Sequence, residues 1–309
     1  MRAESPPSEL LVCPVCRSDL EWRAEAARCT ACGATYEIAD GIPVLRPGQT
    51  DAQKDDQAIF FDEADPEFEV TRPHGTPWLY QWLLAEKFRR SLDALPSAAG
   101  STAVTICGGS GMDAEFLARA GATVISTDIS LGAARRTRER ARRFGFDVLP
   151  VVADATALPL RDRSVDLLYV HDGLHHLESP EDGLREMLRT SRLAISINEP
   201  ARAGATLLAA RVGLAEHYEE AGNFIARVDP AVLAAEVSAA GYDVVKSERY
   251  AMVYRHEPGR AARILSRPGL RTLTRATLGA FNTVAGGLGN KLTLQAIRKD
   301  RDRTDAALG

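Results

Sequence analysis

The sequence has few lysines and no long apolar run. Only five of its 38 basic residues are lysines, and its formal net charge is −4. This balance argues against a generally basic nucleic-acid-binding protein. No apolar stretch approaches the roughly 18–20 residues that a membrane-spanning helix needs, and the N-terminus MRAESPPSEL has no apolar core of a signal peptide. We therefore expect a cytoplasmic protein without a transmembrane segment.

The overall composition is that of a folded protein. Hydrophobic residues make up 45% of the chain and charged residues 26%, which excludes disordered and fibrous classes for most of its length. The 309 residues correspond to one large domain, or to two domains of about 150 residues each.

Four of the five cysteines lie within a segment of twenty residues. They form two C-x2-C pairs, Cys13 with Cys16 and Cys29 with Cys32. Each pair places two sulfurs on one tight turn, and two facing turns present four thiolates in the tetrahedral geometry of structural zinc. Because the four cysteines would fill all four coordination positions of the zinc ion, the role of the metal would be structural rather than catalytic. Two disulfides are the alternative, which a cytoplasmic location disfavours.

The segment around these cysteines is short and predicts strands at 10–12, 20–23 and 35–38. About 35 residues are too few for a sufficient core, so metal binding would contribute the missing folding free energy. The stretches CPVCRSDLEW and CTACGATYEIADGIPVL resemble the small zinc-ribbon activator proteins that partner tRNA and translation-factor methyltransferases. We predict a zinc ribbon at 10–46, and the resemblance implies a methyltransferase as its neighbour.

Beyond a polar linker at 47–57, the sequence first predicts helices and then an alternation of strands and helices. Residues 58–97 carry aromatic and apolar residues at helical spacing, interrupted by prolines, and predict a lid of at least two helices. From 102 onward strands alternate with helices, which predicts a doubly wound parallel α/β sheet with helices on both faces. The expected strands span 102–107, 123–127, 147–152, 165–170 and 193–198. The expected helices span 113–120, 131–144 and 181–189.

A glycine-rich loop, CGGSGMD, follows the first strand of this sheet. Glycines at such a position let the backbone turn sharply and approach a ligand at the start of the next helix. The spacing of Gly109, Gly111 and Ala114 matches the dinucleotide-binding fingerprint, and Asp128 ends the next strand about 20 residues later, where an acid binds ribose hydroxyls. The loop alone therefore fits a nicotinamide cofactor as well as S-adenosylmethionine.

The downstream sequence favours S-adenosylmethionine. Asp154 and Ala155 follow the third strand, where an acid can accept a hydrogen bond from an adenine amino group. The stretch DATALPLRDRSVDLLYVHDGLHHLESPEDGLREML resembles the class I S-adenosylmethionine-dependent methyltransferases, and the resemblance covers about residues 100–200. It implies a Rossmann-like methyltransferase sheet with a cofactor-binding core at 102–198. It also implies two late strands, at 242–250 and 291–297, of which the final one is antiparallel.

The resemblance assigns roles within a methyltransferase domain spanning 58–298. Gly109 and Gly111 would hold the methionine part of the cofactor, Asp128 with Ile129 the ribose, and Asp154 with Ala155 the adenine. Two positions depart from the family, which has an acid where Thr105 stands and a glycine where Cys107 stands. Both replacements are small, so we expect cofactor binding to survive, with Cys107 as a buried apolar side chain of the cofactor site. The departures also leave open a non-catalytic domain.

Methyl transfer from a sulfonium is an in-line displacement, in which the protein supplies orientation and excludes water. If the acceptor is a hydroxyl, a base helps to remove its proton. His171 to His176 follow the fourth strand, where the family lines its methyl-transfer site. We expect His171 to lie beside the methionine moiety and to be a candidate catalytic residue. His175 is the first candidate for a base or an acceptor-orienting group, and its alternative role is to shape the loop. Second-line candidates are Asp172, His217 and Tyr218.

The segments outside the core, at 58–97 and 199–298, would cover the substrate. Within 255–289, arginines recur every three to four residues, and Pro268-Gly269 divides the segment into two helices. Such a basic amphipathic pair could contact an anionic lipid surface or an anionic substrate. Because the whole sequence is rich in arginine, we favour a simpler interpretation, in which the arginines face solvent and the apolar residues on the opposite side of the helices pack against the protein. We likewise expect Trp78 and Trp82 to pack in the core, and we expect surface charge at Arg135, Arg136, Arg138, Arg140, Arg142 and Arg143.

Three functions are compatible with these sequence features. The favoured one is a methyltransferase acting on a small-molecule acceptor, such as a specialised metabolite or a lipid-like compound. The second is a ribosomal or transfer RNA methyltransferase, against which stand the net negative charge and the lack of an aromatic and basic platform for single strands. The third is a non-catalytic module that retains the fold.

Overall fold

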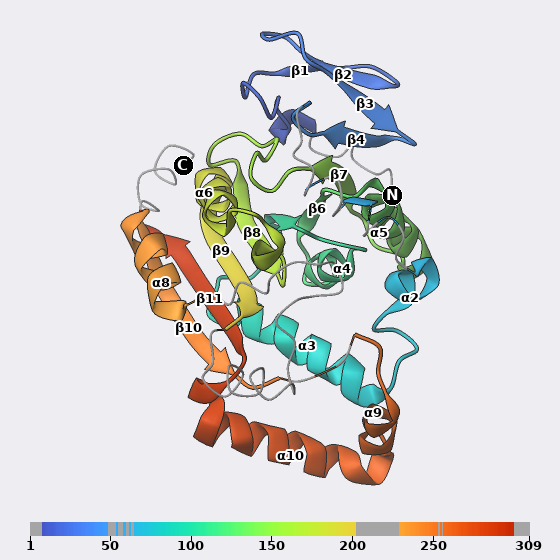
Figure 1. Ribbon diagram of the computed structural model, residues 1–309, viewed down its shortest axis with the longest axis vertical. Helices are drawn as coiled ribbons and strands as arrows, with labels where there is room; N and C mark the ends of the chain where they lie inside the picture. The colour runs from blue at the N-terminus through green and yellow to red at the C-terminus, as the bar shows by residue number, and fades with distance from the viewer. Residues whose placement is uncertain are drawn as a thin grey trace.

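A computed structural model describes residues 8–48, 54, 58–59, 62, 65–201, 229–252, 254 and 256–299. Within these residues the strands form a single sheet in the order β1-β2-β3-β4-β7-β6-β5-β8-β9-β11-β10 (Figure 1). The doubly wound α/β architecture predicted from the sequence is confirmed. His217 and Tyr218 lie outside the described residues.

The central strands are parallel and their carboxyl ends meet at one edge of the sheet. They are β5 (Thr102–Ile106), β6 (Thr123–Asp128), β7 (Leu149–Ala153), β8 (Val165–His171) and β9 (Ser191–Pro200). Next to them, β11 (Lys291–Arg298) runs antiparallel to β9 and to β10 (Tyr242–Tyr250). The predicted antiparallel final strand is therefore confirmed.

Helices cover both faces of this sheet. Apolar side chains of β5 and β8 point alternately to the two sides, so that Val104 and Ala103 lie in different core clusters. On one side pack α6 (Pro180–Thr190) and α8 (Pro230–Ala239). On the other side pack α3 (Trp78–Leu92) and α4 (Met112–Arg119). The remaining helices are α2 (Pro66–Thr71), α5 (Leu131–Phe144), α9 (Arg260–Leu265) and α10 (Pro268–Ala285).

The cysteine-containing segment is joined to the sheet rather than separate from it. Each strand of this segment pairs antiparallel with the next one along the chain. The strands are β1 (Leu20–Trp22), β2 (Ala26–Cys29), β3 (Thr35–Ala39) and β4 (Ile42–Leu45). β4 then pairs parallel with β7, with Val44 opposite Val152 and Leu45 opposite Ala153. Neither β2 nor β4 was predicted from the sequence. The strand expected at 10–12 is wrong, because a 3-10 turn, η1 (Ser8–Leu10), ends there and Leu11 forms only an isolated bridge to Leu160.

The expectation of surface charge around α5 is wrong for Arg136 and Arg140. Arg140 has no exposed surface, and its guanidinium donates to Glu115 and to the backbone carbonyls of Glu69, Val70 and Arg72. These carbonyls lie at the end of α2, so the cation satisfies acceptors that the short helix leaves unpaired. Arg136 is buried against Ser110. The exposed arginines of α5 are Arg135, Arg138, Arg142 and Arg143.

Candidate active site

The glycine-rich loop connects β5 to α4 and lies directly against the end of β6. A Cβ atom on Gly108 would come within 2.5 Å of Ser126 Oγ and 2.7 Å of Thr105 Oγ1, so no side chain fits there. Gly111 has a φ of 79° and begins α4, a left-handed conformation that favours glycine. Thr105, which replaces the acid of the family, instead bonds Ser126 Oγ at 3.0 Å within the core.

Asp128 ties this loop to the end of β6. Its carboxylate accepts hydrogen bonds from the backbone N–H of Gly109 at 2.8 Å and of Ser130 at 2.9 Å. Burial raises the pKa of Asp128, while the bonds from Ser130 and Gly109 oppose that rise. Burial, together with the charge of Asp128, also raises the pKa of Cys107 well above its usual value. Cys107 is therefore held as the neutral thiol rather than the reactive thiolate.

Asp154 occupies the corresponding position directly after β7. One carboxylate oxygen accepts bonds from the backbone N–H and the hydroxyl of Thr156, at 2.8 and 2.7 Å. The other oxygen lies 2.9 Å from Lys54 Nζ. Lys54 was expected in a polar linker, and the structure brings it over the carboxyl ends of the strands. Nearby, Asp62 accepts bonds from Ser130 and Gly132 at the start of α5.

The loop after β8 carries a partly buried network of charges. His171 Nδ1 lies 2.9 Å from Asp113 in the first turn of α4, and His171 Nε2 lies 3.4 Å from Asp172. Burial opposes a charged imidazole, but the charges of Asp113 and Asp172 outweigh it and raise the pKa of His171. The bond between His171 and Asp113 connects the loop after β8 with the cofactor loop.

Asp172 lies between two lysines that were not predicted from the sequence as site residues. Its carboxylate is 2.6 Å from Lys87 Nζ and 2.9 Å from Lys291 Nζ. Burial opposes ionisation, but Lys291 and Lys87 hold the pKa of Asp172 well below its usual range. A carboxylate held so firmly ionised is a poor proton acceptor near neutral pH. The rarity of lysine was the signal that could have found these contacts. Lys87 and Lys291 here, and Lys54 beside Asp154, are three of only five lysines in the sequence.

His175 lies in the same loop and is buried. Its side chain is 1% exposed, and Nδ1 lies 2.7 Å from Glu199 Oε2. The other carboxylate oxygen of Glu199 accepts bonds from the backbone N–H of Gly173 and of Leu174. Glu199, which was likewise not predicted from the sequence, thus connects the end of β9 with the loop after β8. This contact is what the loop-shaping role of His175 requires.

Comparisons with known proteins find similarity to methyltransferases. Residues 104–192 match the family model described as a methyltransferase domain. The demethylmenaquinone methyltransferase of Renibacterium salmoninarum is 30% identical over 143 residues, which are 46% of this chain and 56% of that protein. Over residues 104–192 the chain is similar to methyltransferase domains.

Solved structures support a methyltransferase fold. The magnesium protoporphyrin IX methyltransferase of Synechocystis PCC 6803 covers 80% of this chain and 100% of its own, with a TM-score of 0.52 and 12% identity. The [4+2]-cyclase SpnF covers 81% and 97%, with a TM-score of 0.54 and 15% identity. At these identities the likeness is one of fold alone. The chain spans about half the length of the curated relatives it matches, including a second demethylmenaquinone methyltransferase, from Paenarthrobacter aurescens, at 51%.

The structure brings the predicted cofactor residues together at one edge of the sheet. Each lies at or directly after the carboxyl end of β5, β6, β7 or β8, or at the start of α4. This set is Cys107, Gly109, Gly111, Asp128, Ile129, Asp154, Ala155 and His171. His175 lies below this edge, paired with Glu199.

The four cysteines of the N-terminal segment also come together. Their sulfurs all lie within 4.8 Å of one another, with 3.3 Å between Cys16 and Cys29 and 3.7 Å between Cys13 and Cys32. All four are free thiols. Four thiolates around zinc at about 2.3 Å would be separated by roughly 3.8 Å in a tetrahedron, so the donor set fits zinc. The backbone N–H groups of Ala31 and Cys32 point to Cys29 Sγ at 3.4 Å.

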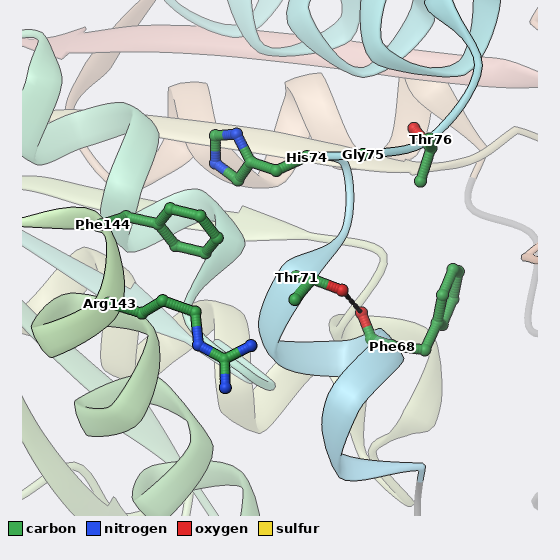
Figure 2. A pocket seen from close by; sticks show the side chains of 7 residues that line it. All are labelled: Phe68, Thr71, His74, Gly75, Thr76, Arg143 and Phe144. Carbon is green, nitrogen blue, oxygen red and sulfur yellow. Dashed lines mark hydrogen bonds between the residues drawn. The ribbon is translucent and has the colours of Figure 1, made fainter.

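A pocket of about 430 Å³ lies outside the predicted site, between α2, the end of α5 and the loop that follows α2 (Figure 2). His74 stacks on Phe144 there, with ring centroids 4.1 Å apart, and bonds Glu115 at 3.0 Å. Phe68, Thr71, Gly75, Thr76 and Arg143 also line it. None of the predicted cofactor residues lines this pocket.

Proposed function

We propose that the protein transfers a methyl group from S-adenosylmethionine to a small, lipid-like acceptor. The observation that carries this proposal is the convergence of the glycine loop, Asp128 and Asp154 on one edge of the sheet. In open α/β sheets that edge is where ligands bind. The named activity of the curated relatives, demethylmenaquinone methylation, supports a lipid-like acceptor.

We assign the cofactor contacts residue by residue. Gly109 and Gly111 would hold the methionine part, Asp128 with Ile129 the ribose, and Asp154 with Ala155 the adenine. When bound, S-adenosylmethionine supplies an activated methyl group on a sulfonium. The protein orients the acceptor and excludes water. His171, held by Asp113, would border the methionine part.

We infer that the acceptor carries an ionisable hydroxyl and that Lys291 receives it, while Asp172 holds both Lys291 and the fully buried Lys87. Asp172 is too firmly ionised to act as a base, so its role would be to fix two ammonium groups. Two cations of this kind would lower the pKa of the acceptor hydroxyl, so that its proton is released to water before transfer and the resulting oxyanion is held for reaction. The same oxyanion serves whether the oxygen itself or a neighbouring ring carbon takes the methyl group, and in the second case the ring proton is then lost to water.

We propose that His175 positions the loop and does not itself act as the base. A base must come within hydrogen-bond reach of the proton that it removes. The imidazole of His175 is buried and paired with Glu199, which suits a structural role better than the role of a base. In the variant His175→Ala we expect lower kcat and nearly unchanged affinity for S-adenosylmethionine. His175→Asn, which retains a donor toward Glu199, should restore part of kcat. A base role instead predicts no rescue and the loss of one limb of the pH–rate profile.

We propose one structural zinc ion bound by Cys13, Cys16, Cys29 and Cys32 in a ribbon at 10–46. Because β4 of this ribbon pairs with β7, the metal would stabilise the edge of the methyltransferase sheet. Metal analysis of the purified chain should give one zinc per molecule.

Calorimetry and a transfer assay test the proposed function. We expect S-adenosylmethionine to bind, and a short-chain demethylmenaquinol to accept a radiolabelled methyl group. Binding without transfer to any quinol or phenol would favour the non-catalytic module. Transfer to RNA alone would favour the second hypothesis from the sequence. Absence of binding would exclude both enzymatic functions.

A further inference from the structure

The helices α9 and α10 carry basic residues and no acidic ones. Between Glu257 and Asp300 the sequence contains neither aspartate nor glutamate. The five arginines at 260–275 are all exposed, and they are Arg260, Arg263, Arg267, Arg271 and Arg275. A segment with this charge pattern is electrostatically suited to an anionic surface.

Large apolar residues of these helices, and of the 3-10 turn η3 (Gly286–Leu288) that follows α10, also face outward. Leu273 is 63% exposed, Val284 88% and Leu288 74%, and Ile264, Leu265 and Phe281 are exposed as well. These six are most of the ten exposed large hydrophobic residues in the described part of the chain. The expectation of a packed apolar face beneath the arginines is therefore wrong. Leu278 of α10 does pack against a core cluster.

Specific contacts hold α10 in this orientation. Arg271 and Arg275 lie over the ring of Trp78 at 5.3 and 5.1 Å, and Trp78 stacks on Trp82. The two tryptophans, expected in the core, pack against a core cluster, but they are only half-buried and are partly covered by arginines. At the other end of the helix, the Asn282 side chain bonds the backbone of Ala251 at 2.7 and 3.1 Å. The outward direction of the apolar residues thus follows from cation–π and polar contacts at both ends.

The helix α3 connects this surface with the proposed acceptor site. Leu79 donates its backbone N–H to Ser266 Oγ between α9 and α10, and Lys87 lies two turns further along α3, against Asp172. In Figure 1, α10 forms the end of the molecule opposite the cysteine-containing segment, with α3 between α10 and the sheet. A ligand arriving at α9 and α10 would meet α3 next.

We propose that α9 and α10 dock the protein on an anionic lipid bilayer. In this arrangement the apolar residues of α10 enter the boundary between headgroups and acyl chains, while the arginines pair with lipid phosphates. No described helix is long and apolar enough to span a bilayer, so the contact is peripheral. The proposal rests on the proposed function in one respect, because the bilayer would present a lipid-like acceptor to the site.

Other occupants fit these observations less well. An RNA backbone would pair with the arginines but would leave Leu273, Val284 and Leu288 without apolar partners. A second copy of the chain would cover the apolar residues but would bring two arginine-rich helices together without an acidic residue between them. An anionic bilayer satisfies both the charge and the apolar surface.

Co-sedimentation of the full chain with vesicles tests this inference. We expect binding to vesicles of equal parts phosphatidylglycerol and phosphatidylcholine, and little binding to phosphatidylcholine alone. The variant Leu273→Ser/Val284→Ser/Leu288→Ser should bind at least tenfold more weakly. Since each basic residue near an anionic surface contributes about fivefold to partitioning, Arg263→Gln/Arg267→Gln should weaken binding by roughly 25-fold at low salt.

A matched control and two readouts keep the test decisive. The variant Val232→Ser/Val245→Ser removes exposed apolar residues of α8 and β10 and should bind vesicles like the unaltered protein. Thermal melts establish that each variant is folded. The inference is overturned if the unaltered protein does not bind anionic vesicles or binds RNA instead. It is also overturned if the folded triple variant binds vesicles as well as the unaltered protein does. Methyl transfer to a short-chain quinol, measured without vesicles, separates this result from a failure of the proposed function.

Discussion

Lys87 Nζ lies 2.6 Å from Asp172 Oδ2, although the lysine has no exposed surface and comes from a helix 85 residues earlier in the chain. Asp172 itself has a φ of 49°, which is uncommon for a residue other than glycine. Such backbone conformations persist where surrounding contacts determine them. Here the contacts with Lys87, Lys291 and His171 place a fixed pair of cations beside the loop after β8.

Replacement of Lys87 tests whether this pair serves the acceptor. In Lys87→Met we expect kcat to fall by about tenfold or more, because one source of oxyanion stabilisation is removed. Affinity for S-adenosylmethionine, measured by calorimetry, should change little. Lys246→Met is the matched control, since Lys246 pairs with Asp93 away from the site. Equal kinetic effects of the two variants would contradict the proposed role.

Replacement of Asp128 tests the ribose contact. In Asp128→Asn we expect the Kd for S-adenosylmethionine to rise by roughly 10- to 100-fold, the magnitude of a lost hydrogen bond to a charged group. Asp166→Asn serves as the control, because Asp166 bonds the backbone of Thr102 at the opposite edge of the sheet. Circular dichroism should establish that the loop variant is folded. A Kd unchanged in Asp128→Asn would exclude the assignment.

The pairing of His171 with Asp113 predicts a pH-dependent stability. The pKa of His171 is raised in the folded state. Its contribution is therefore fully present below the unfolded pKa of about 6.5 and is lost as pH rises through the folded pKa. The free energy of unfolding in urea should decrease across this range. His171→Gln and Asp113→Asn should each flatten that part of the profile, and a profile that stays as steep in both would contradict the assignment.

Removal of zinc should weaken the edge of the central sheet as well as the ribbon. In the absence of metal, or in Cys16→Ser, we expect faster hydrogen exchange in β7 because β4 would no longer pair with Val152 and Ala153. Cys107→Ala should retain one zinc per chain and normal exchange, since this cysteine lies in the cofactor loop. Exchange that increases only within 10–46 would show that the two parts are energetically independent.

Arg140 should be far more important for stability than its neighbours on α5. In Arg140→Met, acceptors at the end of α2 and one oxygen of Glu115 lose their donor. We expect a loss of about 3 kcal/mol, as for other buried ion pairs that lose one partner. Arg142→Met, at an exposed position, should change the free energy of unfolding by less than about 0.5 kcal/mol. Chemical denaturation of the two variants provides the comparison, and equal losses would contradict the structural role of Arg140.

The sequence by itself determined the features that depend on residues close together in the chain. The helix at 131–144 was predicted to the residue, because residue spacing and terminal residues are local signals. The strand at 242–250, which the family resemblance implied, was also placed to the residue. The two C-x2-C pairs and the glycine loop were found for the same reason. Aspartates at strand ends were recognisable because parallel strands bring their carboxyl ends to one edge.

Only the tertiary structure decided which distant residues meet and which way an amphipathic surface faces. The pairing of β4 with β7, the burial of Arg140, and the contacts of Lys87 with Asp172 and of His175 with Glu199 join residues from different elements. The apolar residues of α10 follow a spacing that fits either a packed or an exposed face. Spacing along a helix defines a face, but the direction of that face depends on what the neighbouring elements place against it.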